Sequence, residues 1–515
     1  MRRPVVLVLV VGVLVAALVA GVVGGVLVSA SRRAAPAPTP SVEATWPTPA
    51  AIDWRACTES SLQAAGAECA TVTAPLDWSA PQDGRTVRIA VSRVRHTEQP
   101  YRGVMLVNPG GPGASGLQYA TLGSSVPKGA GAHYDWIGFD PRGVGASRPR
   151  LTCRADYANG PRPAYSPATA AGIAAWRRLA EGYAEACGKR NGALLEHVTT
   201  RDSANDMEYL RLALRAPKIS YYGFSYGTYL GQVYATLYPS RLDRMVLDST
   251  VDPTRVWYGA NLDQDVAFQT AIDAWFQWLA KHDDRYRLGG TRQAVQASYD
   301  RLAAALAAKP AGGVFGSAEL ADTLLYAGYS QSLWTDLGDA FSRGARGSTT
   351  RLQEYWRTLN EVDDDNGYVG YLAVECTDQV WPGEWSMWEA DARRLSRRAP
   401  FETWANTWFN APCRTWPAKA GTPVDVNGAK APPILMIGET LDAATPFSGS
   451  LAVRRLFPRA RLLAEPGGTS HAESLNGNDC VDGTIADYLA DGSLPARKAG
   501  DGPDTTCAPA PQPTP

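Results

Sequence analysis

The 515-residue chain lacks an excess of charge of either sign, because 50 Lys and Arg stand against 51 Asp and Glu for a formal net charge of −1. It also lacks runs of Lys or Arg. Such a chain offers no long-range field to attract nucleic acid, and we expect no nucleic-acid partner. No C-x-x-C motif occurs, and no His lies beside a Cys at metal-ligand spacing. We therefore expect neither a metal site nor a cofactor.

Long apolar runs are confined to the N-terminus, where Arg2 and Arg3 precede the uncharged segment 4–30. A secretory h-region spans about 7–15 residues and a membrane-spanning helix about 20. The run is long enough to span, yet Val28-Ser29-Ala30 resembles a cleavage site. We expect residues 1–31 to be a signal peptide or a membrane anchor, and residues 32–52 to be a Pro/Ala/Thr linker. Either alternative predicts an extracellular protein, secreted or anchored through residues 4–30.

The eight cysteines agree with export, since an even number outside the cell suggests disulfides. Eight cysteines allow 105 pairings, so spacing alone does not determine the connectivity. Pairing of nearest neighbours is the natural hypothesis, with buried free thiols as the alternative. The predicted pairs are Cys57–Cys69, Cys153–Cys187, Cys376–Cys413 and Cys480–Cys507.

Strand-like and helix-like segments alternate along most of the chain. Short apolar runs that end at Gly, Pro or Asp are typical of strands buried in a parallel sheet; they are 103–108, 136–140, 219–224, 245–248 and 434–438. Residues 86–94 alternate like a half-buried strand, and 203–215 resembles a helix with Ser203 as its N-cap. The alternation predicts an α/β fold, a mostly parallel sheet with helices on both faces. Residues 251–400 break it and predict a helical cap inserted between core segments 53–250 and 401–510.

The sharpest motif is Gly223-Phe224-Ser225-Tyr226-Gly227, which fits G-x-S-x-G between a predicted strand and a predicted helix. A nucleophilic Ser at such a turn has strained backbone geometry, so its neighbours two positions away must be small. This context is typical of the nucleophile of α/β-hydrolases. The Tyr226 N–H at the helix start is then placed to stabilise an oxyanion. The alternative is an ordinary Gly-Ser turn.

A second glycine-rich loop, 108–116, follows another predicted strand, where such hydrolases place the second oxyanion donor. We expect that donor to be Gly111. The loop also fits the dinucleotide motif G-x-G-x-x-G, with Asp140 at the end of the next strand. Pro112 removes a backbone N–H from that loop, and the segment after it is a poor crossover helix. We therefore disfavour the nucleotide interpretation.

A Ser nucleophile requires a base and an acid, which follow it in this fold in the order Ser, acid, His. Of five histidines, only His471 lies beyond Ser225 near a later strand, since His282 falls in the helical insertion. The acid should follow the preceding predicted strand, 434–438, after which come Glu439 and Asp442. Asp442 is the predicted acid because it lies further into the loop, and Glu439 is the second choice.

The combination NPGGPGASG, DPRGVGAS, GFSYGTYLG, GETLDAATP and GGTSH resembles the secreted tripeptidyl aminopeptidases of actinobacteria, from about residue 69 to residue 507. These are α/β-hydrolases related to proline iminopeptidases, whose HGGPG loop reads NPGGPG here, with Asn108 in place of His. The resemblance implies that Ser225, Asp442 and His471 form the catalytic triad. It also implies exopeptidase action on peptide N-termini.

An aminopeptidase must hold a protonated amine, which requires carboxylates in a confined pocket. The resemblance implies acidic residues of the cap, and Glu375 and Asp378 are the candidates. The alternative is a solvent-exposed acidic turn beside a disulfide. Two other functions remain open: a carboxylic ester hydrolase with the same triad, and a non-catalytic surface binding protein.

Overall fold

A ten-stranded sheet is the framework of the computed structural model, which describes residues 46–159, 162–167, 169–360 and 364–515. Residues 47–515 form one compact unit. The predicted signal or anchor at residues 1–31 lies outside the described residues, as does most of the predicted linker. Within the described ranges, no helix has both the length and the apolar character needed to cross a membrane.

The strands lie in the order β1-β2-β3-β5-β4-β6-β7-β8-β9-β10. Pairing is antiparallel from β1 to β5 and parallel from β5 to β10 along this order. The sheet is therefore mostly parallel, as predicted. The bounds are β1 Arg55–Ala56, β2 Glu68–Pro75, β3 Thr86–Val94, β4 Gly103–Asn108, β5 Tyr134–Phe139, β6 Ile219–Phe224, β7 Leu242–Asp248, β8 Leu435–Glu439, β9 Arg461–Glu465 and β10 Thr505–Thr506.

Both faces of the sheet are covered. Met105, Tyr222 and Val246 pack on one face against the C-terminal helix α15. On the other face the ring of Tyr221 lies against Gly231 of α4 so closely that a Cβ there would stand 2.6 Å from it. The core helices and 3-10 turns are α1 Ser60–Ala64, η2 Leu117–Ser125, η3 Pro127–His133, α2 Ala170–Asn191, η4 Gly192–His197, α3 Thr200–Ala213, α4 Tyr226–Leu237, η5 Pro239–Arg241, α14 Phe447–Leu456 and α15 Asp479–Asp491.

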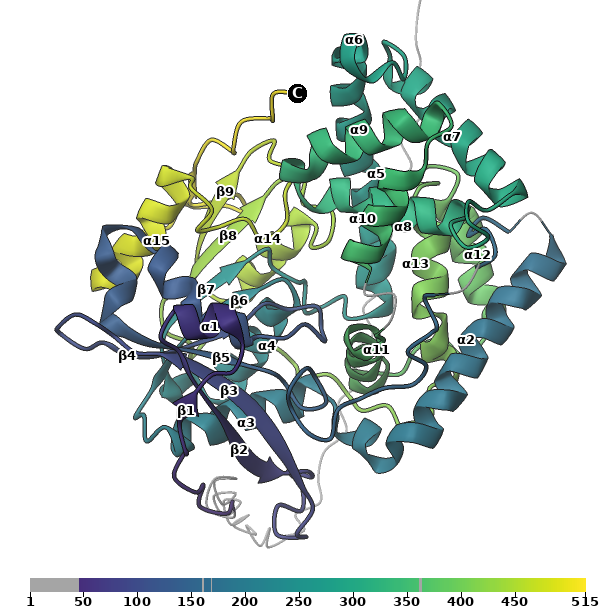
Figure 1. Ribbon diagram of the computed structural model, residues 1–515. Coiled ribbons are helices and arrows are strands. Elements are labelled where there is room, and N and C mark those ends of the chain that lie inside the picture. The colour runs from purple at the N-terminus through teal and green to yellow at the C-terminus, as the bar shows by residue number, and fades with distance from the viewer. Residues whose placement is uncertain (1–45, 160–161, 168, 361–363) are drawn as a thin grey trace, which may run out of the picture. The chain divides into compact units, whose positions relative to one another are not determined.

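The chain between β7 and β8 is helical, and we call it the cap. Its elements are α5 Tyr258–Lys281, α6 Asp283–Tyr286, α7 Arg292–Ala308, α8 Ser317–Tyr329, η6 Gln331–Leu333, α9 Trp334–Ala345, α10 Thr350–Leu359, α11 Asn366–Asp378, α12 Trp385–Leu395, α13 Thr403–Asn410 and η7 Ala411–Thr415. A separate core of Trp, Phe and Leu side chains holds α5 and α7 to α10 together. Helix α2, which precedes the nucleophile in sequence, lies beside α12 and α13 (Figure 1), where Trp176 stacks on Trp408 at 5.7 Å.

One predicted helix start is wrong. Helix α3 begins at Thr200, and its N-cap is Thr199, whose hydroxyl accepts a hydrogen bond from the Asp202 N–H. Ser203 is buried inside the helix instead. Both residues are good N-caps, so the pattern alone did not distinguish them.

The four disulfides confirm the nearest-neighbour pairing. Cys57 is bonded to Cys69, Cys153 to Cys187, Cys376 to Cys413 and Cys480 to Cys507. No cysteine among the described residues is free.

Candidate active site

Ser225 occupies a sharp turn between β6 and α4. Its φ of 54° and ψ of −128° are strained for a residue with a side chain. Gly223 and Gly227 make the turn possible, since a Cβ on either would lie 2.5 Å from a backbone oxygen. Between residues 219 and 235 every residue is buried except Ser225. The turn therefore presents this one hydroxyl at the N-terminus of a helix.

The glycine-rich loop after β4 lies directly against this turn. A Cβ on Gly110 would stand 2.8 Å from the Ser225 Cβ and 2.9 Å from the Tyr226 nitrogen. The Gly110 N–H donates to Asn108 Oδ1 at 3.0 Å and is therefore occupied. Gly111, with φ of 105°, is the next residue whose N–H can serve as an oxyanion donor. The structure thus brings the loop of Gly111 beside Tyr226, whose N–H starts α4 and lacks a partner one turn earlier in the helix.

Asp140 serves this loop rather than a nucleotide. Its carboxylate accepts hydrogen bonds from Ser115 Oγ at 2.6 Å, the Gly116 N–H at 2.9 Å and the Ala146 N–H at 2.7 Å. The side chain is fully buried. A carboxylate that already accepts these bonds is poorly available to a ribose hydroxyl, which agrees with our disfavouring the dinucleotide interpretation.

Asp442 and His471 lie in contact on the loops after β8 and β9. His471 Nδ1 is 3.0 Å from both carboxylate oxygens of Asp442. The carboxylate also accepts hydrogen bonds from the Ala444 N–H, the Thr445 N–H and Thr445 Oγ1. These donors fix the orientation of the carboxylate, and the carboxylate in turn holds Nδ1, so Nε2 is the imidazole nitrogen left for other partners.

The surroundings of His471 favour its protonated form. Burial alone lowers its pKa, but the Asp442 carboxylate outweighs burial, and the pKa lies above the usual value. Both residues are nearly inaccessible, with 8% of the His471 side chain and 1% of the Asp442 side chain exposed. The pair therefore stabilises an imidazolium.

Glu439, the second-choice acid, contacts the backbone before His471. Its Oε2 accepts the Ser470 N–H at 2.6 Å. Burial raises the pKa of Glu439 to about 9, so the group is neutral at pH 7. A neutral carboxyl does not stabilise an imidazolium, and the geometry favours Asp442.

Glu375 and Asp378 lie on α11 and are both buried, which rules out a solvent-exposed turn. Asp378 accepts hydrogen bonds from the Thr200 N–H, Thr200 Oγ1 and Trp257 Nε1. Glu375 accepts hydrogen bonds from the Tyr371 hydroxyl and from Asn261 Nδ2, the latter at 3.2 Å. Both acids are therefore hydrogen-bonded, Asp378 by three donor groups and Glu375 by two.

Helix α11 adjoins the glycine-rich loop, since a Cβ on Gly113 would lie 2.4 Å from the Gly367 oxygen. Burial raises the pKa of Glu375 to about 8. No Lys or Arg in the described part of the chain forms an ion pair with it. Glu375 is thus a buried acid without a cationic partner, on the helix that adjoins the glycine-rich loop.

Two further buried acids of the cap were not foreseen from the sequence. Burial raises the pKa of Asp265 to about 8 and that of Glu402 well above its usual value. Asn406 donates to Asp265 at 3.0 Å and to the Asn261 backbone at 2.9 Å, which joins Asp265 to the surroundings of Glu375. A sequence signal did exist, since Asn261 and Asp265 interrupt the apolar stripe of α5 at helical spacing.

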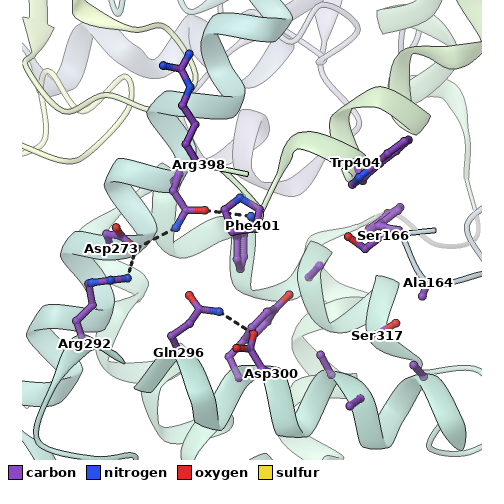
Figure 2. Close-up of a pocket in the computed structure, with 18 residues that line it drawn as sticks. Ala164, Ser166, Asp273, Arg292, Gln296, Asp300, Ser317, Arg398, Phe401 and Trp404 are labelled. Atoms are coloured by element: carbon purple, nitrogen blue, oxygen red, sulfur yellow. Dashed lines mark hydrogen bonds and ion pairs between the residues drawn. The ribbon is translucent and has the colours of Figure 1, made fainter. Parts of the chain in front are cut away.

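A cavity of about 600 Å³ lies in the cap (Figure 2) and contains none of the predicted triad. Its polar side chains pair with one another: Asp273 with Arg292 and Gln269, and Gln296 with Asp300. Phe401 closes one wall of it, next to Glu402 in sequence. Through Phe401 the cavity therefore borders the cap region that holds the buried acids Asp265 and Glu402, and Ser225 is not among the residues that line it.

Known proteins resemble the chain over most of its length. The family model "TAP-like protein" matches residues 399–507. The tripeptidyl aminopeptidase of Streptomyces coelicolor is 41% identical over 481 residues, 90% of this chain and 87% of its own. Serine protease Hip1 of Mycobacterium tuberculosis is 29% identical, covering 87% and 90% of the two chains. Carboxylesterase B of the same species is 30% identical, covering 86% and 88%.

Among solved structures, the proline iminopeptidase of Mycobacterium smegmatis is similar over 81% of this chain and 97% of its own, with 16% identity and a TM-score of 0.35. The family assignment rests on the sequence relatives, of which the Streptomyces enzyme is well above 30% identical over nearly the whole chain. The chain belongs to the family of the tripeptidyl aminopeptidases, serine hydrolases of the α/β-hydrolase fold.

Proposed function

We propose that the chain is an exported serine aminopeptidase that releases short peptides, tripeptides first among them, from free N-termini. The observation that carries this proposal is Glu375, a buried carboxyl without a cationic partner, on a helix beside the oxyanion loop. The 41% identical Streptomyces relative, a tripeptidyl aminopeptidase, supports the same substrate class. The four disulfides support export.

In the proposed mechanism Ser225 Oγ attacks the scissile carbonyl while His471 Nε2 takes its proton. Asp442 holds Nδ1–H and stabilises the imidazolium. The N–H groups of Gly111 and Tyr226 bind the oxyanion of the tetrahedral intermediate. The imidazolium then protonates the leaving amine, and an acyl-enzyme remains on Ser225. A water molecule, activated by His471, hydrolyses it and frees the released peptide.

The substrate's ammonium would supply the cation that the cap acids lack. An opposite charge close to a buried carboxyl favours its ionised form. Approach of the ammonium would therefore favour the ionised form of Glu375. A blocked N-terminus cannot do this, so the same geometry explains a requirement for a free amine.

Hydrolysis of carboxylic esters is the second candidate function. The mycobacterial relative named carboxylesterase B is 30% identical over 86% of this chain, and the triad would serve both reactions. An esterase has no use for an unpaired carboxyl near the oxyanion loop. Loss of that carboxyl therefore distinguishes the two functions.

Glu375→Gln is expected to reduce kcat/KM selectively for peptides with a free amine. Losing one partner of a buried charge pair costs about 2–5 kcal/mol, or roughly 30- to several-thousand-fold. Hydrolysis of p-nitrophenyl acetate, which carries no amine, should be unchanged. The measurement is a comparison of kcat/KM for a tripeptidyl p-nitroanilide and for the ester in wild type and variant.

Asp378→Asn is the matched control, because its carboxylate is already held by Thr200 and Trp257. It should reduce both reactions together or lower the Tm. In wild type, loss of the substrate's ammonium, whose pKa is about 7.7–8.0, predicts a fall in peptide kcat/KM above about pH 8. The pKa of Glu375 near 8 predicts a second fall below that pH, because the carboxyl is then protonated and must lose its proton to bind the ammonium. The ester reaction should show no such fall. Equal losses on both substrates in Glu375→Gln would contradict the amine site.

A further inference from the structure

His471 lies in a loop of residues 468–475, which we call the histidine loop. The loop is held in place by hydrogen bonds from its backbone N–H groups. Five of its N–H groups donate to acceptors from other segments: Ser470 to Glu439 Oε2 at 2.6 Å, His471 to the Tyr329 oxygen at 2.8 Å, Ala472 to Ser249 Oγ at 2.8 Å, Ser474 to Asp248 Oδ2 at 3.0 Å and Leu475 to Asp482 Oδ1 at 2.8 Å. Three of these acceptors belong to the sheet and its loops. The N–H of His471 itself is held by the cap.

The contact with the histidine loop is made by three consecutive cap residues where α8 ends and η6 begins. They are Tyr329, Ser330 and Gln331, and we call them the cap turn. Besides the Tyr329 oxygen, Ser330 Oγ donates to Glu473 Oε1 at 2.6 Å. The Gln331 N–H donates to Ser470 Oγ at 3.2 Å. The Tyr329 ring also meets the His471 ring edge-on, with centroids 5.7 Å apart. The cap turn thus contacts the loop before, at and after the histidine.

The C-terminal tail, residues 508–515, accepts hydrogen bonds from the same turn. The Cys480–Cys507 disulfide anchors its start to α15, and Figure 1 shows the tail running past α15 and β9 to the end marked C. Gln331 Nε2 donates to the Ala510 oxygen at 3.0 Å. Trp278 Nε1 on α5 donates to the Pro513 oxygen at 3.1 Å. One short segment therefore links the core to two elements of the cap.

We infer that the cap turn positions His471, and that the tail keeps the cap turn in place. This inference rests on the proposed role of His471 as the general base. A base must lie within about 2.6–3.2 Å of the proton it takes, and a displacement of 1 Å can cost about 100-fold in rate. The cap thereby positions the general base in addition to covering the substrate. If the cap moved away from the core, the His471 N–H would lose the Tyr329 oxygen that accepts its hydrogen bond. Catalysis therefore depends on contact between the cap and the core.

The test removes the contacts one at a time. Ser330→Ala deletes the bond to Glu473, and its matched control is Ser332→Ala, an exposed serine of the same segment that bonds Ser330 and not the histidine loop. Deletion of residues 510–515 removes the carbonyl oxygens of Ala510, Pro511 and Pro513, which accept hydrogen bonds from the cap, and leaves Cys507 intact. Its control is deletion of residues 514–515, which lie beyond the last contact.

Three quantities are measured: kcat and KM on a free-amine tripeptidyl p-nitroanilide, the second-order rate of Ser225 labelling by a fluorophosphonate, and the Tm. Ser330→Ala should lower kcat and the labelling rate by the same factor, about 10- to 100-fold, with KM unchanged. The tail deletion should act in the same direction, and both controls should match wild type. Glu473→Gln keeps an acceptor oxygen and should retain activity, whereas Glu473→Ala should repeat the loss.

A purely structural contact would lower the Tm without changing kcat of the folded protein, and that result in Ser330→Ala and the tail deletion would overturn the inference. A rise in KM at constant kcat would also overturn it, since the turn would then shape the peptide site only. The fluorophosphonate keeps the two proposals separate. Labelling that survives Ser225→Ala would refute the proposed function. Labelling lost in Ser225→Ala but at wild-type rate in Ser330→Ala would refute the positioning role alone.

Discussion

Ser225→Ala is expected to abolish labelling by fluorophosphonates and to lower kcat by about 10⁶, the loss seen when a triad nucleophile is removed. The reason is geometric. Ser225 is the only accessible residue between positions 219 and 235, at a turn whose glycines leave room for no other side chain. The measurement is gel detection of the labelled protein together with turnover of a tripeptidyl p-nitroanilide.

Ser332→Ala, an exposed serine in the cap, is the control for that experiment and should label like wild type. The Tm of Ser225→Ala should match wild type, because the substitution removes one oxygen and leaves the strained turn as it is. Labelling that persists in a folded Ser225→Ala protein would place the nucleophile elsewhere.

Asp442→Asn should cost about 10⁴ in kcat, the effect of presenting the wrong hydrogen-bond partner to a triad histidine. Asp442 contacts His471 Nδ1 through both oxygens, and its remaining bonds come from the backbone and hydroxyl of its own loop. An amide oxygen in the place of Oδ1 can still accept from the Ala444 and Thr445 N–H groups, and the Thr445 hydroxyl can accept from the amide nitrogen, so the fold should survive. The measurement is kcat on the same p-nitroanilide.

Glu439→Gln is the paired variant and should cost far less. With its pKa raised to about 9, Glu439 is uncharged at pH 7, and a Gln keeps the oxygen that accepts from the Ser470 N–H. If Glu439→Gln proved more damaging than Asp442→Asn, the orienting acid would be Glu439.

Much of the sheet was predictable because its strands are short apolar runs ended by Gly, Pro or Asp. Strands β3, β4 and β6 have the predicted bounds, and β6 leads into the predicted turn at Ser225. A buried strand needs apolar residues on both faces, and that requirement is visible in sequence. The disulfides also followed from sequence order, since each joins cysteines at most 37 residues apart.

The contents of the cap were less predictable. Helix α2 comes before the nucleophile, yet its Trp176 stacks on Trp408 of α13. Nothing local to either residue indicates that they meet. Asp265 gave a weak signal, as a charge within an apolar stripe, but only the fold shows that Asn406 and Glu402 lie beside it.

The contact between the cap turn and the histidine loop is of the same kind. Along the sequence, Tyr329 and His471 are separated by the rest of the cap, β8 and β9. The His471 N–H donates to the backbone oxygen of Tyr329. A backbone acceptor has no sequence signature. Long-range contacts of this kind decide whether Ser225, Asp442 and His471 can work together.

The most direct test of the proposed function uses wild-type protein and two forms of one tripeptidyl p-nitroanilide, one with a free N-terminus and one acetylated. The acetyl group removes the ammonium that Glu375 would bind and leaves the scissile bond unchanged. We expect kcat/KM for the acetylated form to be lower by about 30-fold or more. Equal rates on the two forms would contradict recognition of a free N-terminus and favour a hydrolase indifferent to the amine.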